Sequence, residues 1–250
     1  MHIKSALKIP KIISIIGIYA SVHFSLGLQN VAEAQTTKTK DWLQPLVTHT
    51  QTTKEIVNQL KAKHYVKVTL DDALSERVFD RYLKNLDPQK YYLLQEDLNS
   101  FQELRHKLDN AIETGDLDPA FIIWNVYHQR LIARFEKIIA FLEHGIAQFD
   151  FTKEEEILLD RRDHPWAASE AELDSLWRKR IKDAALSLKL AEKNTDEIKE
   201  LLVKRYKNRL GLTRQTKSED VYQLYINSFT EAYDPHTQYY SPRGMENFNI

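Results

Sequence analysis

Hydrophobic residues recur three and four positions apart along most of the chain. Residues 70–86, 94–108 and 121–142 each carry this spacing, with polar residues between the apolar ones. Such a spacing collects apolar side chains on one face of a helix. We therefore predict an all-α fold, an irregular multi-helix bundle of about seven to nine helices with no substantial sheet.

Capping residues and glycines divide this pattern into separate helices. The residue types that cap helix N-termini stand at Thr69, Asp118, Ser169, Asn194 and Ser218. Glycines at 115 and 211 are typical of C-termini. We expect helices over residues 48–65, 70–86, 94–114, 118–145, 169 onward, 194–210 and 218–233. The widest apolar stripe lies in 118–145, which we expect to be the central helix.

Thr152 opens a further short helix in this scheme, with three glutamates in its first turn. Glu154, Glu155 and Glu156 are consecutive, and neighbouring helical positions point about 100° apart, so they do not converge on one ion. We interpret them as a solvated first turn. Because the nine histidines are scattered and cysteine is absent, we expect neither a metal site nor a cofactor.

The N-terminal stretch has the pattern of a secretory signal. Three lysines precede an apolar run that begins at Ile12, and Ala32-Glu33-Ala34 resembles a cleavage site, which makes Gln35 the first mature residue. The alternative is an uncleaved anchor in the inner membrane. We divide the chain into a signal peptide (1–34), a polar linker (35–47), a helical domain (48–233) and a closing turn with an exit segment (234–250).

Composition and charge narrow the classes of function. The chain of 250 residues is 42% hydrophobic and 28% charged, as is usual for a globular protein, and its net charge is −1. A protein that binds nucleic acid through phosphates normally carries a basic patch, so we expect no nucleic-acid partner. No glycine-rich phosphate loop, HExxH motif or nucleophile elbow occurs.

Two proline-containing stretches interrupt the helices. Asp87-Pro88 predicts a turn followed by a hydrophobic docking segment. Asp160 and Arg161 open a charged loop that ends at Pro165-Trp166. We expect Arg161 and the arginine after it to pair with the aspartates of this loop, each exposed pair contributing about 0–1 kcal/mol.

The closing stretch contains Asp234, Pro235, His236, Tyr239, Ser241 and Pro242. Histidine titrates near neutrality, so one interpretation is catalysis. In the other, Pro235 ends the last helix, Asp234 caps the turn, and Tyr239 and Tyr240 point back at the bundle. We favour the structural interpretation because no serine–lysine pair or second carboxylate completes a catalytic set in this stretch.

Basic residues gather near the end of the helix that Asn194 caps: Lys204, Arg205, Lys207, Arg209 and Arg214. Cations at a helix C-terminus are favoured by the helix dipole, so a solvated face is one explanation. A docking patch for an acidic partner is the other.

Three of these stretches together resemble the tail-specific proteases, the periplasmic carboxyl-terminal processing proteases. They are the closing stretch from Asp234 to Arg243, the segment 86–94, and the irregular run from Leu159 to Trp177. The resemblance covers residues 40–250 and implies the N-terminal helical domain of such an enzyme. In that family a PDZ domain and a serine–lysine protease core follow, and the chain stops at Ile250, where the PDZ domain would begin.

The resemblance implies a serine protease that cleaves proteins after recognising their apolar C-termini. It also implies that the helical domain holds substrate and docks an adaptor, a tetratricopeptide-repeat lipoprotein. No residue here matches the catalytic serine or lysine, so we transfer no catalytic residue and expect the chain alone to be inactive. A stand-alone exported helical module that binds proteins without cleaving them remains the alternative.

Overall fold

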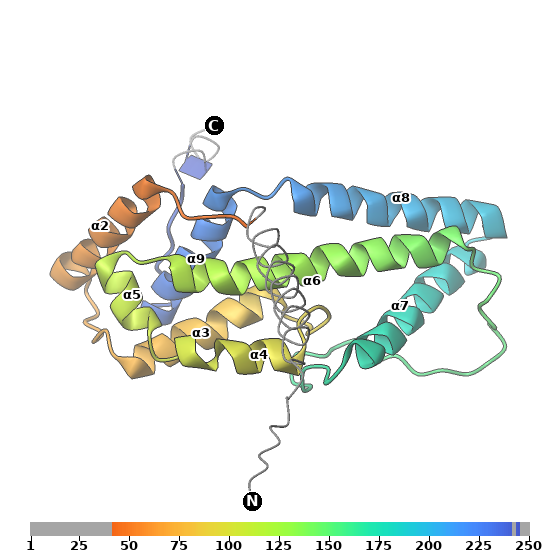
Figure 1. Ribbon diagram of the computed structural model, residues 1–250, viewed down its shortest axis with the longest axis horizontal. Coiled ribbons are helices and arrows are strands. Elements are labelled where there is room, and N and C mark those ends of the chain that lie inside the picture. The colour runs from red at the N-terminus through yellow and green to blue at the C-terminus, as the bar shows by residue number, and fades with distance from the viewer. Residues whose placement is uncertain (1–41, 242–243, 246–250) are drawn as a thin grey trace, which may run out of the picture. The chain divides into compact units, whose positions relative to one another are not determined.

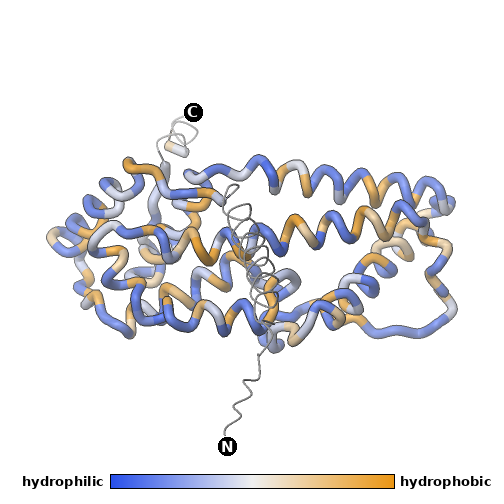
Figure 2. The backbone as a smooth tube through the Cα atoms, viewed as in Figure 1, coloured by the Kyte–Doolittle hydropathy of each residue, from blue (hydrophilic) through white to orange (hydrophobic). Residues whose placement is uncertain are grey.

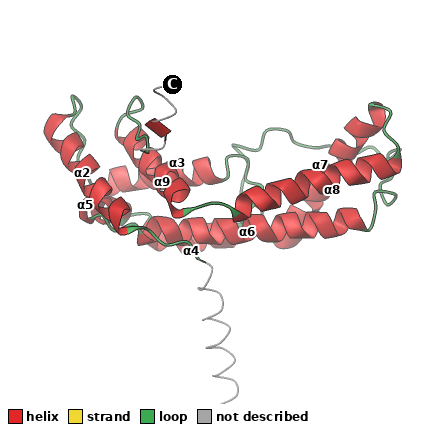
Figure 3. Ribbon diagram, turned by 90° about the horizontal axis from the view of Figure 1, so that it is seen from above, coloured by secondary structure: helices red, strands yellow, loops and turns green. Residues whose placement is uncertain are grey.

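The computed structural model describes residues 42–241 and 244–245 (Figure 1). The predicted signal peptide, most of the polar linker, and Pro242 lie outside these residues. Within them the fold is all-α, as predicted, and no strand occurs (Figure 3). The elements are α2 (Val47–Lys63), α3 (Asp72–Leu86), α4 (Gln95–Phe101), the 3-10 helix η1 (Gln102–Leu104), α5 (Leu108–Thr114), α6 (Asp118–Glu143), α7 (Glu170–Leu190), α8 (Thr195–Arg214) and α9 (Ser218–Tyr233).

One hydrophobic core lies among α2, α3, α5, α9 and the first half of α6. We call this part the base. Its helices pack α3 against α9 and α5, and α2 against α5. Aromatic side chains fill much of the space between them, and the largest that are fully buried are Tyr82, Tyr222, Tyr225, Phe79, Phe101, Phe121 and Phe229. Burial of this apolar area holds the base together.

A second core lies among the second half of α6, α7 and α8. We call this part the arm. Helices α6 and α8 run side by side, and α7 packs on α8 (Figures 1 and 3). Phe135, Ile138, Trp177, Leu202 and Tyr206 are among its buried residues. Helix α6 contributes to both cores, in accordance with the central position predicted for it.

The hydropathy pattern differs between the helices. Figure 2 shows hydrophobic positions spaced along each helix, and they are denser along α6 than along α8. Helix α6 needs the broader apolar stripe because it has neighbours in both cores. Every helix among the described residues is too short or too polar to span a lipid bilayer.

The helix predicted at 94–114 is interrupted. It is split into α4, η1 and α5. The hydroxyl of Ser75, which is fully buried on α3, donates to the Arg105 carbonyl at 2.7 Å and accepts from the Leu108 amide at 2.8 Å. A side chain far away in the sequence thus takes over backbone groups that a continuous helix would pair internally.

Two helix N-terminal caps are confirmed, and three are wrong. Ser169 and Asn194 accept backbone N–H groups of α7 and α8. Helix α3 is capped by Asp71, whose carboxylate accepts from the Leu74 amide at 2.9 Å, and not by Thr69. Asp118 and Ser218 are the first helical residues of α6 and α9, each one position past the cap.

The two glycines predicted at C-termini differ. Gly115 ends α5 with a φ of 72°, a left-handed conformation that favours glycine. A Cβ at this position would lie 2.8 Å from the Thr50 carbonyl oxygen of α2. Gly211 lies inside α8, which continues to Arg214. Its neighbour Leu210 still faces the second core, so burial favours another turn of helix.

The short helix predicted at Thr152 is absent. Residues 151–168 form an extended and irregular segment instead. The interpretation of its glutamates as a solvated first turn is wrong for Glu155, which pairs with Arg178 and Lys182 of α7. Lys182 also donates to the Lys153 carbonyl at 3.0 Å. Ion pairs and hydrogen bonds from the basic side chains of α7 therefore stabilise this segment in an extended conformation, without the backbone hydrogen bonds of a helix.

Candidate functional site

The turn at Asp87 joins α3 to the start of α4. Its carboxylate is 1% exposed and accepts the backbone N–H groups of Tyr91 (2.8 Å), Tyr92 (2.8 Å) and Leu93 (3.0 Å). Burial raises the pKa of Asp87, and the three amides and the charge of Arg161 act in the opposite direction. Asp87 thus fixes the segment that carries Tyr91 and Tyr92 between the base and the arm.

The loop at 160–167 packs directly on this turn. The Arg161 amide donates to the Gln89 side-chain oxygen at 2.7 Å, and the ammonium group of Lys90 donates to the His164 carbonyl and lies 5.5 Å from the ring centre of Trp166. Two stretches that the sequence singled out separately, Asp87-Pro88 and Asp160–Trp166, therefore lie together. Pro88, Lys90 and Trp166 line a shallow cleft of about 480 Å³ between them.

The two arginines of this loop behave differently. Arg162 pairs with Asp160 at 2.6 Å, as predicted. The prediction of an ion pair for Arg161 is wrong, because its side chain turns inward and is 8% exposed. Its guanidinium lies 6.0 Å from the ring centre of Tyr91, and it forms no ion pair with any described residue.

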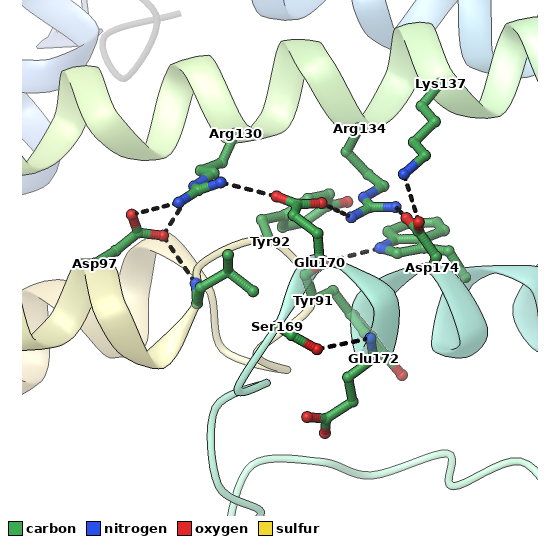
Figure 4. Close-up of polar contacts among 12 residues, drawn as sticks. Tyr91, Tyr92, Asp97, Arg130, Arg134, Lys137, Ser169, Glu170, Glu172 and Asp174 are labelled. Atoms are coloured by element: carbon green, nitrogen blue, oxygen red, sulfur yellow. Dashed lines mark hydrogen bonds and ion pairs between the residues drawn. The ribbon is translucent and has the colours of Figure 1, made fainter.

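A network of charged side chains on α6 ties α4 to α7 (Figure 4). Arg130 donates to both oxygens of Asp97 at 2.9 Å and to Glu170 at 2.8 Å. Arg134, 5% exposed, donates to Glu170 at 2.8 Å and to Asp174 at 2.6 Å. Glu170 therefore bridges two arginines one helical turn apart. These contacts hold the N-terminus of α7 against α6.

None of the network residues was predicted from the sequence. Arg130 and Arg134 stand at i and i+4 within the apolar stripe of α6, and that is the signal by which they could have been found. A charged pair on a core-facing helix needs partners, but the sequence does not say which helix supplies them. The indole N–H of Trp177, which donates to the Tyr91 carbonyl at 2.8 Å, completes this junction.

The closing turn is organised by Asp234, at the end of α9. Its carboxylate accepts from the Tyr65 hydroxyl at 2.9 Å, the Thr237 hydroxyl at 2.9 Å and the His236 amide at 3.2 Å. Burial acts to raise the pKa of Asp234, but the hydrogen bonds from Thr237 and Tyr65 outweigh it and hold the pKa below its usual value. This turn is thereby fastened to the segment that follows α2.

A second histidine, His64, lies close to the Asp234 carboxylate, with its Nε2 3.8 Å away. Nε2 of His64 lies 2.9 Å from the Thr237 hydroxyl oxygen, while Nδ1 lies 3.1 Å from both the amide nitrogen and the carbonyl oxygen of Val66. The Thr237 hydroxyl donates its proton to Asp234, so its oxygen is left to accept a hydrogen bond from Nε2 of His64. His64 is therefore not placed to deprotonate Thr237, and the side chains of Pro235 and His236 are exposed.

The exit segment after this turn lies against α9. The Tyr239 amide donates to the Asn227 side-chain oxygen at 2.7 Å, and the Asn227 amide group donates to the Tyr239 carbonyl at 3.2 Å. The half-buried ring of Tyr239 packs 5.5 Å from that of Tyr222, as predicted. The same prediction is wrong for Tyr240, which is 44% exposed, whereas Ser241 is buried.

The five basic residues predicted as a partner surface fall into different environments. Lys207 and Arg214 pair with glutamates of α6 at 2.8 and 2.5 Å. Arg209 lies 5.6 Å from the centre of an aromatic ring of its own helix. Lys204 and Arg205 are exposed and form no ion pair with the residues that the structure describes. Only part of the predicted surface therefore carries charge that is not already paired.

Two comparisons with known proteins bear on this geometry. A family model described as the tail specific protease N-terminal domain matches residues 56–243. A tail-specific protease of Haemophilus influenzae is 36% identical over 234 residues, which cover 92% of this chain and 33% of that protein. The chain thus spans about a third of the length of this curated relative. Within the described part of the chain, no group of three or more histidine, aspartate or glutamate side chains is arranged to hold a metal ion.

Proposed function

The chain belongs to the tail-specific protease family through that family's N-terminal domain, and on this premise we propose that it is the substrate-holding helical part of a periplasmic serine protease. The single observation that supports substrate holding is an apolar cleft in the arm. Ile138 and Phe141 of α6 face Trp177 and Ile181 of α7 across it, and its volume is about 420 Å³.

The chemistry of this cleft suits unfolded protein chains. The lining also includes Arg134, Lys137, Asp174 and Arg178, whose charges are paired with one another or with Glu155. Apolar pockets with a few polar groups at the rim bind side chains without demanding one sequence. Six of the twelve exposed large hydrophobic side chains among the described residues also lie on the arm or on the segment leading to α7: Leu158, Leu159, Leu186, Leu190, Leu201 and Leu212.

The base has a different task in this proposal. Asp234 fastens the closing turn to the segment that follows α2, and Asn227 of α9 fastens the exit segment, so the chain leaves the domain in a defined direction. A PDZ domain and a serine–lysine core that follow such a segment would be placed reproducibly relative to the arm. Substrates with apolar C-termini would then reach the serine while the arm holds another part of the same chain.

The exposed basic side chains of α8 are the docking surface that we propose for an adaptor, a tetratricopeptide-repeat lipoprotein. Lys204 and Arg205 are available for an acidic partner. Replacing both by glutamate should abolish co-purification with the adaptor and leave cleavage of unfolded substrates unchanged. Unaltered co-purification would show that these side chains of α8 do not bind the adaptor.

Export is proposed from the N-terminal pattern. The first residue of the mature protein should be Gln35, after removal of residues 1–34. Sequencing the N-terminus of protein from the periplasmic fraction tests this. Retention of Met1 in the inner-membrane fraction would contradict cleavage.

The test of the proposed function compares two proteins. The chain alone should bind unfolded proteins with apolar C-termini and not hydrolyse them, because it provides no serine–lysine pair. A protein that joins it to a PDZ domain and a serine–lysine core should cleave them. Cleavage by the chain alone would mean that a nucleophile has been missed. If the chain binds these proteins but does not increase their cleavage by the joined protein, the alternative of a stand-alone binding module would be favoured.

A further inference from the structure

Three buried polar atoms without a hydrogen-bond partner meet at one aromatic ring. They are Nε of Arg161, Nε of Arg180 and the hydroxyl oxygen of Tyr91. The Arg180 guanidinium lies 3.9 Å from the ring centre of Tyr91, and that of Arg161 lies 6.0 Å from it. Buried polar groups in proteins are nearly always paired, so a group of three unpaired donors on one ring requires an explanation.

The charges of these arginines are not neutralised by the protein. Within the described residues, neither Arg161 nor Arg180 forms an ion pair, although Arg161 is only 8% exposed. Burying an unpaired cation costs free energy, and two cations on one ring also repel each other. Stacking on Tyr91 offsets part of this cost, because a guanidinium is attracted to an aromatic face.

The acidic groups nearby have other partners. Asp87 acts on Arg161 only through space, since its two oxygens already accept three backbone amides. Glu155 pairs with Arg178 and Lys182 on α7. Neither Asp87 nor Glu155 therefore forms an ion pair with Arg161 or Arg180.

A third arginine adds to the positive field. Burial raises the pKa of Tyr206, and the charges of Arg209 and Arg180 act together against that rise. The same two arginines act on Tyr92, which neighbours Tyr91 in the chain. Arg209 comes from α8 and Arg180 from α7, so two helices direct positive charge to Tyr92 and Tyr206.

We propose that Arg161 and Arg180 bind a small oxyanion, a carboxylate or a phosphate, beside the ring of Tyr91. The guanidinium group presents parallel N–H donors that match two oxygens of such an anion. The Tyr91 hydroxyl can donate a third hydrogen bond. A bound anion would link the 160–167 loop to α7 and thereby stabilise their contact. This proposal does not depend on the proposed function.

The experiment measures anion binding to the chain itself. Inorganic phosphate and, separately, acetate are titrated at constant ionic strength in chloride. The readouts are tryptophan fluorescence, to which Trp177 contributes with the Arg180 guanidinium 5.3 Å from its ring, and the melting temperature. Saturable binding of either anion supports the site, and the anion that saturates identifies its chemistry.

Single substitutions identify the residues. Arg180→Gln, at a half-buried position that tolerates replacement better than Arg161, should weaken binding about tenfold or more, as expected for a charge-assisted hydrogen bond. Tyr91→Phe keeps the ring and should weaken binding severalfold. Arg162→Gln is the matched control, because this arginine pairs with Asp160 on the exposed side of the same loop. It should bind with the affinity of the unchanged protein.

The melting temperature of Arg180→Gln distinguishes loss of anion binding from misfolding. Without anion, Arg180→Gln should melt no lower than the unchanged protein, since it removes a repelled charge, and anion should no longer raise its melting temperature. The proposal is overturned if neither phosphate nor acetate saturates, or if Arg162→Gln weakens binding as much as Arg180→Gln does. The second outcome would mean nonspecific attraction to a basic surface.

Discussion

The base and the arm share α6 but are stabilised by different interactions. In the base, tyrosine and phenylalanine rings are buried among the helices, and the hydroxyl of the buried Tyr82 donates to the Ala120 carbonyl at 3.2 Å. In the arm, cations lie over rings, and ion pairs hold the extended segment and the start of α7. Charged contacts are screened by salt and depend on the protonation of their groups, whereas apolar burial does not depend on charge. We therefore expect substitutions and solution conditions to affect the two parts differently.

The largest effect should come from the core of the base. Leu74→Ala removes a side chain that is fully buried between α3 and its neighbours, and it should lower the free energy of unfolding by about 2–5 kcal/mol. Leu212→Ala, at a 68% exposed position of the arm, is the control and should change it by less than about 0.5 kcal/mol. Urea denaturation measures both. Similar losses in the free energy of unfolding for Leu74→Ala and Leu212→Ala would contradict the difference between the base and the exposed face of the arm.

The charged junction should come next. Arg134→Ala leaves Glu170 and Asp174 without a buried partner and should cost about 1–3 kcal/mol, less than a fully buried pair because these carboxylates are half exposed. Arg162→Ala removes an exposed ion pair, which solvent screens, and should cost much less. Hydrogen exchange should show the loss for Arg134→Ala concentrated at the start of α7. Equal exchange along α7 and α3 would contradict a local role.

Asp87 connects the two parts and gives a pH-dependent prediction. Because its pKa is raised in the folded protein, the folded state binds more protons than the unfolded state between the usual pKa and the raised one. Stability from this group is therefore complete below the usual pKa and is lost as the pH rises through the raised one. Asp87→Asn should cost about 1–3 kcal/mol through unpaired amides. The difference in the free energy of unfolding between Asp87→Asn and the unchanged protein should become smaller as the pH rises from the usual pKa of aspartate through the raised one. Unfolding in urea at a series of pH values measures this difference.

The closing turn should show smaller effects. Tyr239 is half buried rather than fully buried, so Tyr239→Ala should cost about 1–2 kcal/mol instead of the roughly 3 kcal/mol of a core aromatic. His236→Ala should cost less than about 0.5 kcal/mol, because its side chain is exposed. Thermal unfolding ranks the two. In a protein joined to a protease core, loss of cleavage by His236→Ala at unchanged stability would reopen the catalytic interpretation of this stretch.

Those parts of the structure that depend on neighbours along the chain were predictable from the sequence. The helical faces, the caps at Ser169 and Asn194, and the turn at Asp87 follow from residues within a few positions of one another. Contacts between distant segments were not predictable. The break before α5 depends on Ser75, which is 33 positions from Leu108. The inward turn of Arg161 depends on where Tyr91 lies, which no local pattern states.

The most direct test of the account asks whether the arm holds substrate. In a protein that joins this chain to a PDZ domain and a serine–lysine core, Phe141→Ser alters the apolar cleft of the arm. Ile122→Ser is the matched control, a 40% exposed apolar residue of the same helix within the base. We expect Phe141→Ser to raise KM for an unfolded substrate roughly tenfold with kcat unchanged, because a binding contact is lost, and Ile122→Ser to alter neither. An unchanged KM for Phe141→Ser, in a variant that folds normally, would contradict it.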